Sequence, residues 1–246
     1  MNEMFGDIKR LNRSGRLLLF LLLSWLISLL FLMNARIETN DPLGYYAQTV
    51  ALAERASTDL SHEAVQLDEF GWIHNLKKDP VTGKVYSQYP IGVSLMQLPF
   101  YFIGKAFEEP SRAGGPWTGD RVWWVCAGSA FYGLSGLLFL LLLGRQLWGS
   151  IVSMLATIFI FLGTALFYYM FFQPGMSHSY AFFLSSSFLF AWLRPLILDG
   201  RLNWGQARDR SHNSSFLLGV LLGFCFIVRY LDGLLCLFLV FECILL

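Results

Sequence analysis

Charge is scarce in this sequence, and the motifs that mark many soluble enzymes are missing. Charged residues make up 14% of the 246 positions, and the formal net charge is +1. No basic surface is therefore concentrated enough to neutralise a run of phosphates, which excludes a nucleic-acid partner. The sequence contains no phosphate-cradling glycine loop, no zinc-ligand spacing and no nucleophile elbow. It also lacks an internal repeat, which excludes a solenoid.

Cysteine is rare as well, and its placement excludes two roles. The four cysteines fall inside apolar runs, with neither the spacing of a metal knuckle nor that of a disulfide framework. We expect Cys126, Cys225, Cys236 and Cys243 to be small packing or lipid-facing residues. These patterns imply no cofactor, and they leave the need for a divalent metal open.

Apolar residues are abundant: they make up 55% of the chain, and aromatic residues make up 17%, more than in ordinary soluble domains. A helix needs about 20 mostly apolar residues to cross the hydrocarbon of a bilayer. The sequence therefore predicts an all-α polytopic membrane protein with five to six transmembrane helices, forming a single membrane domain over residues 1–246. The expected spans are Leu17 to Met33, Val122 to Leu143, Ile151 to Phe172, Ser179 to Leu198 and Phe216 to about Leu231, with a further run beginning at Leu234.

Loop charges orient these runs. Four basic residues precede the first run, which is long for a signal peptide, so we expect an uncleaved anchor with the N-terminus in the cytoplasm. The apolar stretch Pro90 to Gly104 is ambiguous, because four later arginines would lie outside if it crossed. We therefore place it as a helix in the outer interface. The basic residues are Lys9, Arg10, Arg13 and Arg16, and the later arginines are Arg145, Arg201, Arg208 and Arg210.

Residues 34–121 then form one long extracytoplasmic loop between the first span, residues 17–33, and the remaining spans in residues 122–246. Asp41-Pro42 has the pattern of a helix start, with Asp41 as the cap. The apolar residues that follow have helical spacing and predict a short amphipathic helix on the membrane surface. Turn residues around Asp79 to Gly83 predict a small hairpin.

Two positions in this loop carry groups suited to chemistry. Asp41 is expected close to the outer surface, beside Tyr45 and Tyr46. It is either a helix cap or, because it is fixed at a helix start, a general base. Tyr89, in Tyr89-Pro90-Ile91-Gly92, is either an aromatic-belt residue at an ordinary loop-to-helix junction or part of a binding path.

Two more candidates lie in the later runs. His178 is expected at the outer mouth between the third and fourth long runs, either as an interfacial residue or in a cavity shared with Asp41. Arg229 lies at membrane depth, where a charge normally faces a cavity or a partner. Its alternatives are an ion pair with Asp232 and contact with outer headgroups. A carboxylate, a histidine, an arginine and an aromatic roof on one face suit an anionic lipid substrate.

Three local motifs resemble the membrane glycosyltransferases of the GT-C fold. The group concerned is the dolichyl-phosphate-mannose mannosyltransferase-like group, which includes the bacterial glycosyltransferase family 39 and the aminoarabinose transferase proteins. The motifs are Asn40 to Gln48 (NDPLGYYAQ), Tyr89 to Phe100 (YPIGVSLMQLPF) and Arg229-Tyr230.

The resemblance implies a catalytic base at Asp41 and a sugar donor carried on a polyprenyl phosphate. The sequence departs from the family pattern at Pro42, where a second acidic residue is common, and at Ile91, where a second proline is common. Members of this group usually have more spans, so we expect the chain to correspond to the N-terminal part of a GT-C module.

The leading prediction is an inverting glycosyltransferase of a bacterial inner membrane. It would move a hexose or pentose from a polyprenyl-phosphate donor to a glycan, lipid or protein acceptor at the outer face, among membrane lipids. Asp41 would be the base, and the residues expected to bind substrate are Tyr45, Tyr46, Tyr89, His178 and Arg229. The alternatives are a transporter or flippase half, a polysaccharide-assembly membrane protein and an inactive fragment. Transporters place polar groups near the midplane of the bilayer, so candidates at the outer ends of the runs favour the enzyme.

Overall fold

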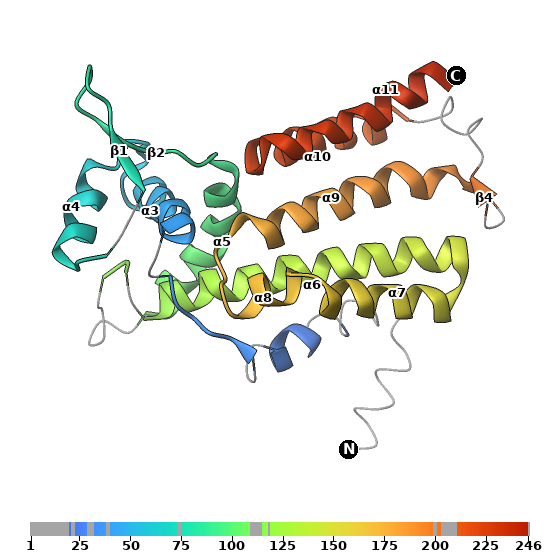
Figure 1. Cartoon of the computed structure of the whole chain (residues 1–246), viewed down its shortest axis with the longest axis horizontal. Helices are drawn as coiled ribbons and strands as arrows, with labels where there is room; N and C mark the ends of the chain where they lie inside the picture. The colour runs from blue at the N-terminus through green and yellow to red at the C-terminus, as the bar shows by residue number, and fades with distance from the viewer. Residues whose placement is uncertain are drawn as a thin grey trace.

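The computed structural model is mostly helical, with two small antiparallel hairpins (Figure 1). It describes residues 20, 23–28, 32–37, 40–72, 75–108, 115–117, 119–198, 201–202 and 211–245. The helices are α3 (Asn40–Arg55), α4 (Ser61–Glu69), α5 (Gly92–Phe107), α6 (Asp120–Trp148), α7 (Ser150–Gly163), α8 (Leu166–Phe171), α9 (Ser177–Leu193), α10 (His212–Val228) and α11 (Cys236–Leu245), with the 3-10 helices η2 (Arg194–Leu196) and η4 (Tyr230–Leu235). The strands are β1 (Leu76–Lys78) paired with β2 (Val85–Ser87), and β3 (Ile197–Leu198) paired with β4 (Arg201–Leu202).

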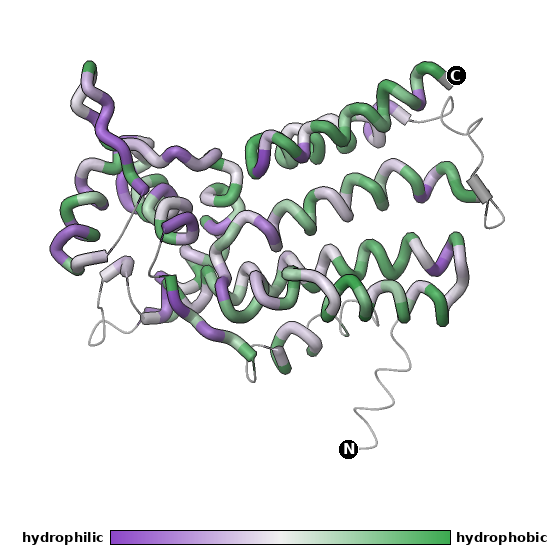
Figure 2. The backbone as a smooth tube through the Cα atoms, viewed as in Figure 1, coloured by the Kyte–Doolittle hydropathy of each residue, from purple (hydrophilic) through white to green (hydrophobic). Residues whose placement is uncertain are grey.

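The elements form two regions. Helices α6, α7, α9, α10 and α11 run along the long axis of the molecule, whereas α3, α4, α5 and the β1–β2 hairpin gather at one end (Figure 1). The long helix α6 is central, because it contacts α5, α7, α8 and α9. Hydrophilic residues concentrate in the α3, α4 and hairpin end, and the long helices are mainly hydrophobic (Figure 2). The polar end therefore supplies most groups that could carry out chemistry.

The expectation of five to six transmembrane helices is wrong. In the described part of the chain, α6 is the one helix long and apolar enough to cross a membrane, and 56% of its most apolar window is buried inside the protein. It contains the expected span 122–143. The first expected span, residues 17–33, is described only in part, at residues 20, 23–28 and 32–33. The four N-terminal basic residues, Arg208 and Arg210 lie outside the described residues.

Backbone breaks explain why the other apolar runs do not become long helices. In the run 151–172, α7 ends at Gly163, and Thr164 is extended with φ −120° and ψ 170°. The Thr164 hydroxyl accepts a hydrogen bond from the Leu166 amide at 3.2 Å and so assists a new helix, α8. The run 179–198 stops at Leu193, because Pro195 follows and cannot donate to a helix. The run 216–231 stops at Val228, because Arg229 is extended with φ −148°.

Two local expectations in the long loop are confirmed. The β1–β2 hairpin forms, with Lys77 opposite Tyr86. A helix covers the region after Asp41, although α3 begins one residue earlier, at Asn40, and places Asp41 in its first turn. The apolar stripe of α3 is buried against other parts of the protein, including α5, and so does not lie open on the surface as an amphipathic surface helix would.

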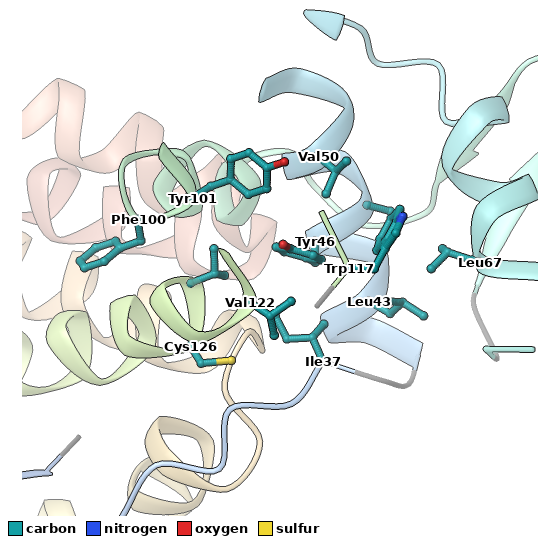
Figure 3. Close-up of a cluster of buried hydrophobic side chains, with 12 residues drawn as sticks. Ile37, Leu43, Tyr46, Val50, Leu67, Phe100, Tyr101, Trp117, Val122 and Cys126 are labelled. Atoms are coloured by element: carbon teal, nitrogen blue, oxygen red, sulfur yellow. The ribbon is translucent and has the colours of Figure 1, made fainter. Parts of the chain in front are cut away.

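A hydrophobic cluster joins α3 to α5 and α6 (Figure 3). Tyr46 lies in it at 1% exposure, against Tyr101 and Trp117. Burying aromatic rings of this size contributes on the order of 25 cal/mol for each Å² of apolar surface removed from water. The cluster therefore fixes α3 rigidly, and with it the first-turn carboxylate of Asp41. Its buried members are Ile37, Leu43, Tyr46, Ala47, Val50, Leu67, Phe100, Tyr101, Trp117, Val122, Val125 and Cys126.

Candidate functional site

The carboxylate of Asp41 is held by a single phenol. Asp41 Oδ1 accepts a hydrogen bond from the Tyr89 hydroxyl, and Tyr89 lies just before α5. The Tyr89 oxygen also accepts hydrogen bonds from the side-chain amides of Asn75 and Gln88, each at 3.0 Å. A phenol has one hydrogen and two acceptor lone pairs. These three bonds use that capacity fully, so the Tyr89 hydrogen points to Asp41.

Tyr89 reaches α3 because Gly44 has no side chain. A Cβ atom at Gly44 would lie 2.8 Å from Cδ2 and Cε2 of Tyr89, closer than real Cβ contacts come. The Tyr89 ring lies against Tyr45, with a centroid distance of 4.9 Å and an interplanar angle of 39°. Gln48 Nε2 donates to the Tyr89 carbonyl at 3.0 Å. One face of α3 therefore positions both the ring and the backbone of Tyr89.

Arg229 and His178 come to this region from α10 and α9. Arg229 Nη1 lies 3.4 Å from His178 Nδ1. Since an arginine can only donate, Nδ1 accepts and the imidazole proton lies on Nε2. The His178 ring stacks on Tyr169 with a centroid distance of 3.9 Å and an interplanar angle of 12°. The histidine is thus fixed between an aromatic face and a guanidinium.

Two glycines bring these helices close to α3 and α5. Gly175 has φ +89°, and a Cβ there would lie 3.3 Å from Cβ of Pro42, so the turn before α9 contacts the start of α3. At Gly92, the first residue of α5, a Cβ would lie 2.5 Å from the backbone of Ile227 near the end of α10. The Gly92 contact holds the end of α10 against α5, and Arg229 follows directly.

A cavity of about 350 Å³ lies in this region, lined in part by Tyr45, Tyr89 and Arg229. Tyr89 forms part of the wall and links the cavity to Asp41, while Arg229 lies in the same wall. The starts of α5 and α9 adjoin the cavity, and neither has a side-chain cap. The first amide groups of a helix carry partial positive charge. The cavity therefore combines a guanidinium with two helix starts, and its lining residues are Tyr45, Gln88, Tyr89, Pro90, Ser177, Val228, Arg229, Tyr230 and Leu231.

The electrostatics of the site keep its titratable neighbours neutral near pH 7. Burial lowers the pKa of His178, and the Arg229 charge lowers it further, against an opposing effect of Asp41. Burial raises the pKa of Tyr89, and its hydrogen bond to Asp41 raises it further. Burial also raises the pKa of Tyr45, although a hydrogen bond with Ser177 opposes this. Asp41 and Arg229 act in opposite directions on the pKa of Tyr45, which Asp41 raises and Arg229 lowers.

The structure brings together most of the residues expected from the sequence. Asp41, Tyr45, Tyr89, His178 and Arg229 all lie at or beside the cavity.

Tyr46 does not join them, because adjacent residues on a helix point about 100° apart. Its hydroxyl donates to the Pro116 carbonyl, and its ring lies in the core cluster (Figure 3). The guanidinium of Arg229 contacts His178, and Asp232 instead donates its backbone N–H to the Arg229 carbonyl at 2.8 Å.

Three site residues were not expected from the sequence. Asn75 and Gln88 flank the two strands of the hairpin, and together they bind the Tyr89 hydroxyl. Ser177 begins α9 and lines the cavity. The signal that could have found the amides is their position at the two ends of a predicted hairpin, because antiparallel pairing brings those ends together.

Two further observations concern metal ligands and a second cavity. The described residues include no group of three or more His, Cys, Asp or Glu side chains placed to hold a metal ion. A larger cavity of about 620 Å³ lies between residues of α6, α7 and the N-terminal segment. It is lined almost entirely by apolar side chains, so it offers no acid, base or cation for chemistry.

We expect Gly44→Ala to destabilise the protein. Alanine within a helix normally stabilises by about 1 kcal/mol relative to glycine, but here the new methyl group would displace the Tyr89 ring. The midpoint of thermal unfolding should therefore fall. The matched control is Gly219→Ala in α10, where a Cβ meets nothing within 4 Å and the midpoint should rise. An equal rise of the unfolding midpoint in both variants would contradict the close contact between Gly44 and the Tyr89 ring.

We expect Tyr89→Phe to lower the free energy of unfolding by about 1–3 kcal/mol, because Asn75, Gln88 and Asp41 would each lose a partner. The measurement is chemical unfolding followed by circular dichroism. Tyr86→Phe is the control, since Tyr86 is 45% exposed on the same hairpin and its change should stay within about 0.5 kcal/mol. Equal free energies of unfolding in Tyr89→Phe and Tyr86→Phe would show that the Tyr89 hydroxyl does not stabilise the site.

Comparisons with known proteins do not add a family to this description. No protein-family model, curated protein or solved structure matches the chain. The function is therefore argued from the geometry and charge of the site.

Proposed function

We propose that the chain acts as a glycosyltransferase at the outer face of a membrane, moving a sugar from a polyprenyl-phosphate donor to an acceptor hydroxyl. One observation carries the proposal: a single cavity has Arg229 in its wall and, through Tyr89, the Asp41 carboxylate at its side. A base and an anion-binding group are the two parts that transfer from a phosphate-linked sugar needs.

The chemistry follows from these two groups. Asp41 takes the proton of the acceptor hydroxyl while the oxygen of that hydroxyl forms a bond to the anomeric carbon of the donor sugar. The bond from that carbon to the phosphate oxygen breaks, and its electron pair stays on the leaving lipid phosphate. A single displacement, in which the acceptor oxygen enters opposite the departing phosphate, inverts the anomeric configuration.

The positive side of the cavity suits the leaving phosphate. Arg229 can donate two parallel hydrogen bonds to phosphate oxygens. His178, with Nδ1 accepting from Arg229, orients the guanidinium. The uncapped starts of α5 and α9 add partial positive charge. This arrangement stabilises the negative charge that grows on the phosphate as the glycosidic bond breaks.

The size and lining of the cavity suit one sugar unit. Its volume of about 350 Å³ lies at the small end of the range of roughly 300–1,000 Å³ found for ligand pockets. Tyr89 presents ring surface that can pack on a sugar, whereas Tyr45 is 4% exposed and contacts the Tyr89 ring. A pocket of this kind accommodates a hexose or pentose with its phosphate.

The apolar character of the chain supports an integral membrane location. The four basic residues before the first apolar run favour an N-terminus in the cytoplasm, which the proposal places in a bacterial cell. Helix α6 is long and apolar enough to cross a bilayer. Large apolar side chains are exposed on other helices, including Phe159 at 73%, Phe216 at 76% and Ile244 at 75%. Exposed apolar surface of this kind is suited to lipid. A lipid-linked donor would approach the site from that environment. The motifs around Asp41, Tyr89 and Arg229 agree with the GT-C resemblance.

We expect Asp41→Asn to reduce sugar transfer by about 10²–10⁴-fold, the usual contribution of a general base. The amide can still accept a hydrogen bond from Tyr89, so the fold should be unchanged. The assay measures transfer of radiolabelled sugar from a panel of polyprenyl-phosphate donors by membranes containing the protein. Asp120→Asn is the control, because Asp120 also lies in the first turn of a helix and is exposed. Full activity in the Asp41 variant would refute the assignment of the base.

We expect Arg229→Gln to raise the KM for the donor by about 10–100-fold, because a hydrogen bond to a charged group contributes roughly 1.5–3 kcal/mol. Arg229→Lys should recover part of the loss, since it keeps the charge but not the fork of donors. Arg145→Gln is the control, because Arg145 is exposed in the last turn of α6. An unchanged donor KM in Arg229→Gln would remove Arg229 from the donor site.

A further inference from the structure

The β1–β2 hairpin projects from the body of the protein beside the site (Figure 1). Its register places Lys77 directly opposite Tyr86, and Leu76 directly opposite Ser87. Directly opposed residues share one face of an antiparallel pair, and successive residues alternate between faces. Leu76 packs against the core cluster. Lys77 and Tyr86 therefore lie on the outward face, where both are exposed.

The hairpin is firmly attached to the polar end of the protein. The Val85 amide donates to Asp59 Oδ1 at 3.2 Å, and the Val85 carbonyl accepts from the Leu60 amide at 2.8 Å. Asp59 Oδ1 also accepts from the Ser61 hydroxyl at 2.7 Å. The segment between α3 and α4 thus fixes β2 on its outer edge. The outward face is a rigid platform.

This platform leads into the cavity. Gln88 lies two residues beyond Tyr86, lines the cavity and donates its amide to the Tyr89 hydroxyl. A strand rises about 3.3 Å per residue, so Tyr86 and Gln88 are separated by roughly 7 Å along the chain, comparable to the length of one hexose unit. A chain of sugars that ends at the rim of the cavity, beside Gln88, would reach the Tyr86 ring with its next unit.

The charge of the hairpin is positive. Lys77, Lys78 and Lys84 are exposed. Two acids lie nearby: Asp59, which binds the Val85 amide and interacts electrostatically with Lys84, and Asp79. Asp79 accepts hydrogen bonds from the Val81 amide at 2.8 Å and the Thr82 hydroxyl at 2.8 Å. Its carboxylate therefore maintains the turn and does not pair with the lysines. An anionic ligand on this face would meet ammonium groups beside an aromatic ring.

We propose that the outward face of the hairpin binds the acceptor, and that the acceptor is an acidic oligosaccharide carrying carboxylate or phosphate groups. The terminal sugar of the acceptor lies at the rim of the cavity beside Gln88 and directs its hydroxyl to the donor sugar inside. The next sugar packs on Tyr86, and an acidic group pairs with Lys77. A flat ring next to an ammonium matches a sugar ring that carries an acid. This inference rests on the proposed function, because it assigns the acceptor of that transfer.

The test measures binding without the donor. Fluorescently labelled oligogalacturonate is titrated into the detergent-solubilised chain, with maltooligosaccharide of the same length as the neutral comparison. The acidic sugar should bind more tightly, and added salt should weaken it. Lys77→Gln and Tyr86→Ala should each raise its Kd about fivefold. Lys78→Gln is the matched control, because Lys78 lies opposite Val85 on the other face. The Kd of this variant for oligogalacturonate should equal that of the unchanged protein.

The outcomes separate this inference from the proposed function. Equal binding of the acidic and neutral sugars, an equal loss in Lys77→Gln and Lys78→Gln, or tighter binding of poly-glutamate than of oligogalacturonate would each overturn the assignment of the acceptor. Selective binding that depends on Lys77 and Tyr86 supports it, even if no donor yields transfer and the proposed enzyme activity fails. Transfer that depends on Asp41 but is insensitive to both hairpin variants would overturn the acceptor surface alone.

Discussion

The contact between α3 and the start of α5 is the constraint on which the rest of the site depends. Two buried hydrogen bonds join α3 to α5: Ser94 donates to the Tyr45 carbonyl at 2.8 Å, and Thr49 donates to Gln97 Oε1 at 2.7 Å. A partly buried bond from Gln48 to the Tyr89 carbonyl, at 3.0 Å, fixes the residues just before α5. In an apolar interior such groups cost free energy unless each finds its partner. The two helices therefore have one register, and that register brings Asp41 and Tyr89 together.

The parts of this arrangement that could be predicted from sequence are the local ones. A proline after Asp41 and turn residues around Gly83 are short-range signals, and the helix and the hairpin form where they indicate. The association of Asp41 with Tyr89 depends on Gly44, a residue with no chemistry of its own. Its role is apparent only when the ring that lies over it is known. Tyr45 and Tyr46 were both assigned to the site, although helical geometry directs only Tyr45 there.

Hydropathy predicted more membrane-spanning helices than the described part of the chain has, for a reason visible at Thr164. A hydropathy sum treats the run 151–172 as continuous, because threonine and glycine lower the sum only slightly. The backbone responds differently: α7 ends at Gly163, and the Thr164 hydroxyl binds both the Ile160 carbonyl at 2.7 Å and the Leu166 amide at 3.2 Å. One side chain thus ends one helix and starts the next, and no average over the run records this.

The saturated hydroxyl of Tyr89 has a stereochemical consequence. Its one hydrogen and two lone pairs are committed to Asp41, Asn75 and Gln88, so a molecule entering the cavity gains no hydrogen bond from that oxygen. The phenol covers Asp41 Oδ1 along their hydrogen bond, so in the proposed reaction an acceptor hydroxyl approaches the carboxylate from another direction. The protein alone therefore determines the direction from which a hydroxyl of the ligand can approach the carboxylate. A chiral substrate can present only those hydroxyls whose configuration points along that line.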